Sequence, residues 1–161
     1  MSKEEAAADK TPNVKKLYIR GTVSNGVAVA IIYFLFWMVP AMKPYCFLAC
    51  AIQYAVFLAH GLPQRSEKFY DLSGSFTHLS LVAMSLAAQR RERSPRQMFV
   101  ALASVVWMTR LGSFLYNRIL RDGKDGRFDG IKPVWLSFLG AWTLQALWVT
   151  LIQMPVILLN R

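Results

Sequence analysis

The chain has 161 residues, of which 55% are hydrophobic and 13% aromatic, and its mean hydropathy is +0.31. The length suits a single domain, and the composition excludes an ordinary soluble protein. The net charge of +10 is compatible with nucleic-acid binding, but the basic residues lie mainly in short connections between apolar blocks, where they set membrane topology. We therefore expect a protein of the lipid bilayer with no nucleic-acid partner.

The opening segment, residues 1–20, is polar and carries charges of both signs. It is too long and too acidic for the start of a signal peptide, so we expect a cytoplasmic tail before the first membrane helix. The rest of the chain, residues 21–161, is expected to form one transmembrane domain.

Uncharged blocks dominate that domain, and a bilayer core needs about 20 such residues per helix. Four blocks of near that length cover 21–42, 44–64, 72–89 and 133–160. A further block, 97–109, is long enough only if its helix continues through Arg110. In hydrocarbon every backbone N–H and C=O needs an internal partner, which favours helices. The sequence thus predicts an all-α, polytopic transmembrane helix bundle with about five membrane helices, at about 22–39, 44–59, 72–89, 97–117 and 133–159.

The basic residues between these helices predict the orientation of the chain. With five spans, one side of the membrane receives six basic residues and the other receives twelve, namely Lys3, Lys10, Lys15, Lys16, Arg20, Arg65, Lys68, Arg118, Arg121, Lys124, Arg127 and Lys132. An excess of Lys and Arg marks the cytoplasmic side. We therefore expect an integral, multi-pass protein with its N-terminus and the loop 118–132 in the cytoplasm, and in a eukaryotic cell we expect the endoplasmic reticulum as its membrane.

Polar side chains gather where the second and third spans meet, in the stretch QRSEKFYDLSGSFTH (64–78). If a helix begins near Ser66, one of its faces carries two carboxylates, a phenol and an imidazole, from Glu67, Tyr70, Asp71 and His78. One interpretation is a helix start at the membrane interface, with the carboxylates near the positive end of the helix dipole. The other is a binding site, where Glu67, with Tyr70, hydrogen-bonds a polar group of an apolar ligand.

Arg110 lies inside the fourth expected span. An arginine at that depth costs roughly several kcal/mol unless it is paired or reaches the interface, so it marks a candidate site. The charged loop begins roughly 10 Å further along the helix, which allows the side chain to snorkel. A buried partner such as Glu67 or Asp71 would instead favour a site within the bundle. We treat Arg110 as a candidate substrate-binding residue.

The loop RDGKDGRFDG (121–130) combines acidic, basic and glycine residues. Each of its aspartates precedes a glycine, which is typical of tight turns. The spacing differs from that of a calcium-binding loop, and we expect no metal site in the chain. Backbone N–H groups beside glycines, together with arginines, suit the binding of phosphate.

Two glutamines in the fifth expected span, Gln145 and Gln153, are unusual for positions that face lipid. We expect both to hydrogen-bond neighbouring helices, with a ligand contact as the alternative, and Gln145 is a candidate substrate-binding residue. A transporter fits less well, because the sequence shows no inverted repeat.

A family resemblance rests on three segments: QRSEKFYDLSGSFTHLSLVAMSL, WMTRLGSFLYNRILRDGKDGRFDGIKP and WTLQALWVTLIQMPVILLN. They cover the chain from about Gln64 to Asn160 and are similar to the first half of the DUF1295 family, the steroid 5α-reductase-like multi-pass membrane proteins. The resemblance implies a reductase that uses NADPH to add a hydride and a proton across a C=C bond of an apolar lipid or sterol-like substrate.

The resemblance also implies roles for individual residues. Glu67 and Tyr70 would be catalytic and polarise the substrate carbonyl, with Asp71 beside them in the substrate wall. The cytoplasmic loop would lie near the cofactor phosphates, through Arg118, Lys124, Asp125 and Arg127.

Family members continue past the segment that matches PVILLN, with a second half that carries a G-L-W-x-x-S-R-H-P-N-Y-x-G-E motif associated with the cofactor. We therefore expect a fragment, a truncated product or one half of a split enzyme, inactive without a chain that carries the second half. The alternative is a non-catalytic multi-pass membrane protein with a lipid pocket or a scaffold role.

Overall fold

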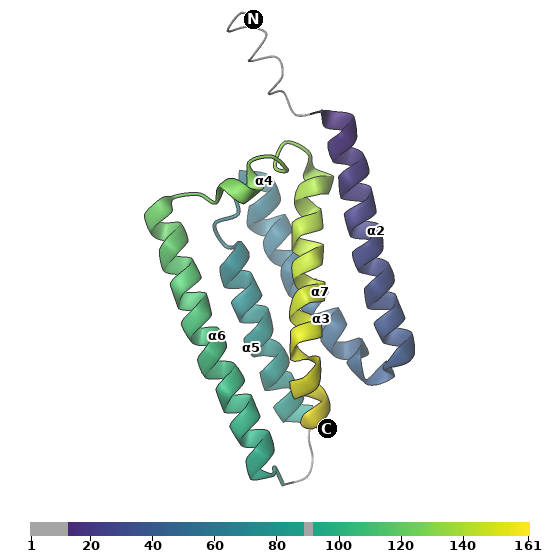
Figure 1. The fold of residues 1–161 in the computed structure, drawn as a ribbon, viewed down its shortest axis with the longest axis vertical. Helices are drawn as coiled ribbons and strands as arrows, with labels where there is room; N and C mark the ends of the chain where they lie inside the picture. The colour runs from purple at the N-terminus through teal and green to yellow at the C-terminus, as the bar shows by residue number, and fades with distance from the viewer. Residues whose placement is uncertain (1–12, 89–91) are drawn as a thin grey trace, which may run out of the picture.

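The computed structural model describes residues 13–88 and 92–161, and within them all regular secondary structure is helical (Figure 1). The five long helices of this part of the chain are α2 (Val14–Met38), α3 (Lys43–Val56), α5 (Tyr70–Ala88), α6 (Pro95–Asp122) and α7 (Trp135–Leu159). A π-helical turn, η2 (Phe57–Gly61), and the short α4 (Leu62–Gln64) prolong α3. Two 3-10 turns complete the chain, η1 (Pro40–Met42) and η3 (Gly126–Phe128).

Four helical segments are long and apolar enough to cross a membrane: Val14–Met38, Pro40–Gln64, Pro95–Asp122 and Trp135–Leu159. The prediction of an all-helical membrane bundle is confirmed. The remaining long helix, α5, lies alongside α6 and α7 (Figure 1) but is less apolar, because it carries several polar residues. Those side chains are buried within the bundle, at Ser73, Ser75, Thr77, His78 and Ser85.

The helix boundaries differ from the expected spans at some ends. Residues 1–12 of the expected tail lie outside the described residues, as does residue 89 of the third expected span. The first helix begins at Val14, well before position 22, because Asn13 accepts a hydrogen bond from Lys16 N and caps it. The fourth helix runs through Arg110 without a break.

The chain direction alternates along the bundle, so its connections gather at two ends (Figure 1). The start of α2, the turn 65–69 and the loop 123–134 lie at one end. The turn between α2 and α3, the start of α6 and the end of α7 lie at the other. A capping box between Ser94 and Gln97 begins α6, and Gly123 ends it with a φ of +76°, which a residue without a side chain adopts readily.

The helix α7 occupies the centre of the bundle and packs against α2, α3 and α5, while α6 lies at one edge and packs mainly against α5. Among the four apolar segments, α7 is the most buried. Its contact with α2 is close: a Cβ on Gly21 would lie 2.6 Å from Ser137 N. Asn25 crosses the same interface, donating to Leu136 O at 3.0 Å and accepting from Thr143 Oγ1 at 2.6 Å. Small residues and interhelical hydrogen bonds are typical of helix association in lipid.

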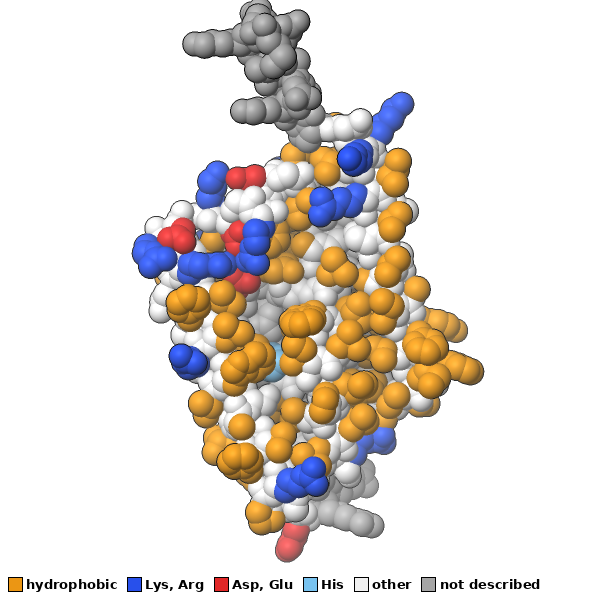
Figure 2. Space-filling view, viewed as in Figure 1, with side chains coloured by type: hydrophobic (Ala, Val, Ile, Leu, Met, Phe, Trp, Pro, Cys, Tyr) orange, Lys and Arg blue, Asp and Glu red, His pale blue; other side chains and the backbone are white. Residues whose placement is uncertain are grey.

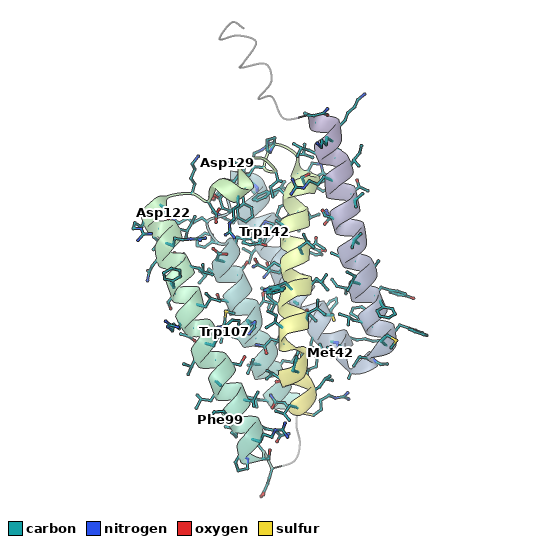
Figure 3. All side chains as sticks on the ribbon, viewed as in Figure 1. Met42, Phe99, Trp107, Asp122, Asp129 and Trp142 are labelled. Carbon is teal, nitrogen blue, oxygen red and sulfur yellow. The ribbon has the colours of Figure 1, made fainter. Side chains whose placement is uncertain are left out.

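The outer surface of the bundle is apolar between two charged ends (Figure 2). Large side chains are widely exposed on this surface, among them Trp37, Phe47 and Phe99. Figure 3 shows Asp122 and Asp129 at the end that carries the loop 123–134, and Phe99 near the other end. This distribution suits a bundle whose sides face hydrocarbon and whose ends face water.

Candidate functional site

Glu67 connects the turn before α5 to the loop after α6. Its side chain is only 4% exposed. Glu67 Oε1 accepts a 2.7 Å hydrogen bond from Asp125 N, and Glu67 Oε2 pairs with Lys132 Nζ. The expected helix start near Ser66 is wrong: α5 begins at Tyr70, and Glu67 lies in the preceding turn. The Glu67 carboxylate is therefore held by the loop and not by a helical face.

Asp125 is the centre of a second group of ion pairs. Its carboxylate is 11% exposed and accepts hydrogen bonds from Arg118 Nη2 at 3.0 Å and from Arg127 Nη2 at 2.5 Å. The hydrogen bonds from Arg127 lower the pKa of this carboxyl below its usual range. Arg118 also pairs with Asp71 at 3.4 Å. Asp71 thus joins α5 to the same network.

The basic residues expected to hold cofactor phosphates are already paired with carboxylates. Arg118 and Arg127 share Asp125, and Lys124 Nζ lies 3.0 Å from Asp129 Oδ2. A phosphate cradle needs donors that are available to the anion. These pairs use only part of each cation, and Nη1 of Arg127, for example, takes no part in them. The structure brings all four predicted residues together at one end of the bundle.

Tyr70 packs inside the bundle at the start of α5. Its hydroxyl donates to Ala141 O at 3.0 Å, and its ring centroid lies 4.8 Å from that of Phe128 and 5.2 Å from that of Trp142. Edge-to-face aromatic contacts of this kind stabilise a packed cluster. The hydroxyl that we expected to polarise a substrate therefore binds the backbone of α7.

Gln145 belongs to a buried polar network between α3, α5 and α7. Its Nε2 atom donates to Tyr70 O at 2.8 Å and lies 3.3 Å from Gln53 Oε1. Gln53 Nε2 donates in turn to Thr77 Oγ1 at 2.8 Å. The expected hydrogen bonds between neighbouring helices are present. Gly74 makes room for them, because a Cβ there would lie 2.5 Å from Gln145 Nε2.

A groove runs between α6 and α7, with α5 as its floor. Its cavity volume is about 130 Å³. Figure 2 shows a hollow on this face of the bundle, and Figure 3 places Trp107 on α6 beside it. The walls are largely apolar, with Trp107 44% and Trp148 63% exposed at the rim. Polar groups are concentrated on the floor and the adjoining α7, from Asp71, Ser75, His78 and Gln145.

His78 is the unpaired polar group of this floor. The residue is 2% exposed, and its Nε2 atom has no hydrogen-bond partner within the described residues. Its ring lies 5.4 Å from that of Trp107. A buried nitrogen without a partner is costly unless a ligand or water satisfies it. The sequence placed His78 on the polar face of α5 but did not distinguish it as a site residue.

Arg110 does not line this groove and instead borders a separate cavity of about 260 Å³ with Trp107, Leu111 and Phe114 of α6. The buried residues Met108 and Gly112 lie two positions before and after it, so Arg110 is on the side of α6 opposite to these two residues. It is exposed and has no ion pair among residues 13–88 and 92–161. Asp71, one of its expected partners, pairs with Arg118 instead.

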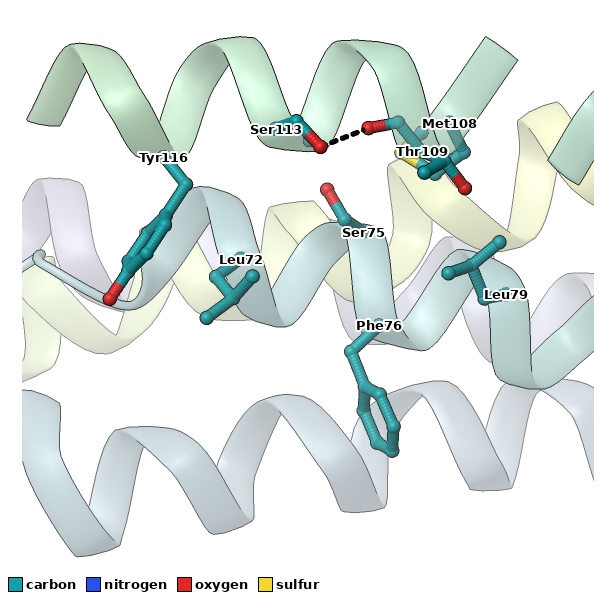
Figure 4. A pocket seen from close by; sticks show the side chains of 9 residues that line it. Leu72, Ser75, Phe76, Leu79, Met108, Thr109, Ser113 and Tyr116 are labelled. Carbon is teal, nitrogen blue, oxygen red and sulfur yellow. Dashed lines mark hydrogen bonds between the residues drawn. The ribbon is translucent and has the colours of Figure 1, made fainter. Parts of the chain in front are cut away.

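A second cleft, with a cavity volume of about 250 Å³, lies on the other side of the contact between α5 and α6 (Figure 4). Two of its hydroxyl groups donate to backbone carbonyls of their own helices: Ser113 Oγ to Thr109 O at 2.7 Å, and Ser75 Oγ to Asp71 O at 3.0 Å. Thr109 and Tyr116 also line it. The remaining lining is mostly apolar. This cleft suits contact with lipid chains.

Comparison with known protein families gives one match, and the matched region contains the groove. Residues 56–161 match the family described as "Protein of unknown function (DUF1295)". The matched region includes the whole of α5, α6 and α7, and it therefore contains every residue that lines the groove. No curated protein and no solved structure matches the chain.

Proposed function

We propose that this chain, which belongs to the DUF1295 family, takes an apolar lipid from the bilayer into the groove between α6 and α7 and holds one polar group of that lipid at His78. The buried, unpaired Nε2 atom of His78 carries the proposal. A hydroxyl or carbonyl group of the ligand would satisfy that nitrogen, in one tautomer of the ring or the other. Gln145 and Asp71 lie beside it along the groove.

The size of the groove limits how the lipid binds. Pockets for whole small molecules usually have volumes of about 300–1,000 Å³. A cavity of about 130 Å³ takes part of a lipid, such as its polar end and the first carbons of its chain. The rest would lie against the apolar rim, near Trp107 and Trp148. Entry from the side fits a groove whose rim faces hydrocarbon.

The reaction that we propose for this site is the reduction of a C=C bond in a lipid or sterol-like substrate, with NADPH as the reductant. Its support is the family resemblance and the polar floor of the groove. Because the loop cations are paired, the cofactor phosphates must meet other groups or displace those pairs. We assign the substrate contact to His78 and a positioning role to Glu67 and Tyr70, whose polar atoms bind the loop and α7.

A second function is favoured by the same ion pairs. A non-catalytic member of the family would keep the bundle and the lipid groove, and its loop charges would stabilise the fold instead of binding a cofactor. Titration of the purified protein with NADPH distinguishes the two functions: saturable binding at micromolar concentration supports the reductase, and its absence supports the non-catalytic protein or a requirement for a partner chain.

We further propose that the end carrying the loop 123–134 faces the cytoplasm. The start of α2 and this loop lie at the same end of the bundle (Figure 1), and both are rich in basic residues. An excess of basic residues favours the cytoplasmic side.

Lipid binding can be tested with a long-chain alcohol brominated along its chain, since bromine quenches nearby tryptophan emission. We expect saturable quenching in the detergent-solubilised protein, and we expect that quenching to be lost when Trp107 and Trp148 are both replaced by Phe. His78→Phe should weaken binding of the alcohol by about tenfold, equivalent to about 1.4 kcal/mol. Ser80→Ala on the exposed side of α5 is the matched control. Equal quenching with and without the two rim tryptophans would refute the groove as the site.

A further inference from the structure

A further pocket opens at the charged end of the bundle, between α2, α7 and the loop 123–134. Its cavity volume is about 240 Å³, and it shares no lining residue with the groove between α6 and α7. Arg20 of α2 and Arg127 of η3 supply its positive charge. Its apolar lining includes Phe128, Ile131 and Leu144.

Both arginines have N–H groups that can bind an anion. Arg20 has no hydrogen-bond or ion-pair partner in the described part of the chain. Arg127 uses its Nε and Nη2 atoms to hold Asp125, and this leaves Nη1 available. No carboxylate lines the pocket. Charge-assisted hydrogen bonds from guanidinium groups to phosphate oxygens are strong, so the free guanidinium of Arg20 together with Nη1 of Arg127 suits a phosphate group.

The surroundings of the pocket indicate where such a phosphate would come from. The pocket lies at the end of the bundle where the charged side chains collect, and Figure 2 shows hydrophobic side chains continuing below that end over α2 and α7. Leu144, at the apolar side of the pocket, is itself 45% exposed. A molecule with a phosphate at one end and hydrocarbon at the other matches this change from charged to apolar surface.

We propose that this pocket binds the phosphate of a membrane phospholipid, with Arg20 and Arg127 on the anion and the acyl chains along α2 and α7. The site is independent of the substrate groove. Arg20 precedes the region that matches the family, residues 56–161, so the site combines a residue of α2 with the matched loop.

Native mass spectrometry of the detergent-solubilised chain with added phosphatidylglycerol tests the proposal. We expect one tightly bound lipid per chain in the wild type and an affinity about tenfold lower in Arg20→Gln, as the loss of one charge-assisted contact predicts. Arg127→Gln should weaken binding as well. The matched control is Arg96→Gln, which should bind the lipid normally. Arg96 is exposed at the start of α6, at the end of the bundle away from this pocket.

Three results would overturn the proposal. One is unchanged lipid affinity in Arg20→Gln, and another is an equal loss in Arg96→Gln, which would indicate nonspecific attraction of anions. The third is binding of inorganic phosphate as tight as that of phosphatidylglycerol, which would assign the pocket to a free anion. Because Arg20 makes no contact that the fold needs, its variant should melt at the wild-type temperature. Quenching by the brominated alcohol should also be unchanged in Arg20→Gln, so this site and the groove are tested separately.

Discussion

The backbone N–H of Asp125 donates a 2.7 Å hydrogen bond to the carboxylate of Glu67, although 58 positions separate the two residues in the sequence. Together with the ion pair between Glu67 and Lys132, this contact fastens the turn before α5 to the loop after α6. The Glu67 carboxylate therefore stabilises the fold, and we expect its removal to lower the stability of the protein.

Glu67→Gln should therefore lower the stability of the protein. The amide can still accept a hydrogen bond from Asp125 N, but Lys132 loses its buried partner, and we expect a loss of about 1–3 kcal/mol in the free energy of unfolding. Unfolding in detergent, followed by tryptophan fluorescence, measures the loss. Glu92→Gln, at the exposed start of the segment before α6, is the control. Wild-type stability combined with lost turnover would instead support the catalytic role predicted from the sequence.

Tyr70→Phe tests the second predicted catalytic residue. The substitution keeps the aromatic packing against Phe128 and Trp142 and removes only the hydrogen bond to Ala141 O. We expect a loss of about 0.5–1.5 kcal/mol in the free energy of unfolding, with no change in binding of the brominated alcohol. A large fall in affinity for the alcohol without a change in stability would return the hydroxyl to the substrate site.

The ion pairs of the loop predict how stability depends on pH. The hydrogen bond from Arg127 lowers the pKa of Asp125 in the folded protein, and the hydrogen bond from Lys124 lowers that of Asp129. A lowered pKa means that the stabilisation is fully present above the unfolded value of about 4 and is lost as the pH falls through the folded value. We expect the melting temperature to fall below pH 4, and to fall less in Arg127→Gln than in wild type or in Arg96→Gln. Identical acid profiles for the three proteins would contradict this assignment.

Gly74→Ala should disturb the polar network around Gln145. The added Cβ would lie 2.5 Å from Gln145 Nε2, so the glutamine must move and lose its bonds to Tyr70 O and Gln53. Overpacking of this kind costs about 1–3 kcal/mol. Gly126→Ala, where a Cβ meets nothing within 4 Å, is the matched control for thermal unfolding. If both variants melt alike, the network contributes little to stability.

The bundle could be predicted from the sequence because uncharged blocks of membrane length fix where helices form, whatever packs against them. The partners of the polar residues could not be predicted in the same way. Glu67 faces Lys132 and Asp125, and Asp71 faces Arg118 and not Arg110. The pair of Asp71 with Arg118 depends on how α6 is rotated against α5, and the contacts of Glu67 depend on the path of the loop after α6. Periodicity within one segment gives the faces of that helix but not which face a distant helix presents.

His78 could not be identified as a site residue from the sequence either. In the sequence it is one polar residue in an uncharged block, and nothing there distinguishes a histidine that faces a neighbouring helix from one that faces a groove. Its unpaired Nε2 atom and its position opposite Trp107 are evident only after α5 and α6 are packed together.

The polar character of α5 has a consequence for how the protein is made. A helix that keeps serines, a threonine and a histidine inside the bundle is less favourable in hydrocarbon on its own than the helices around it. We expect α5 to remain near the translocon until α6 and α7 have been synthesised and can shield its polar side chains. The ion pair of Glu67 with Lys132 can form only when residue 132 has left the ribosome, so it joins a turn that is made early to a loop that is made late.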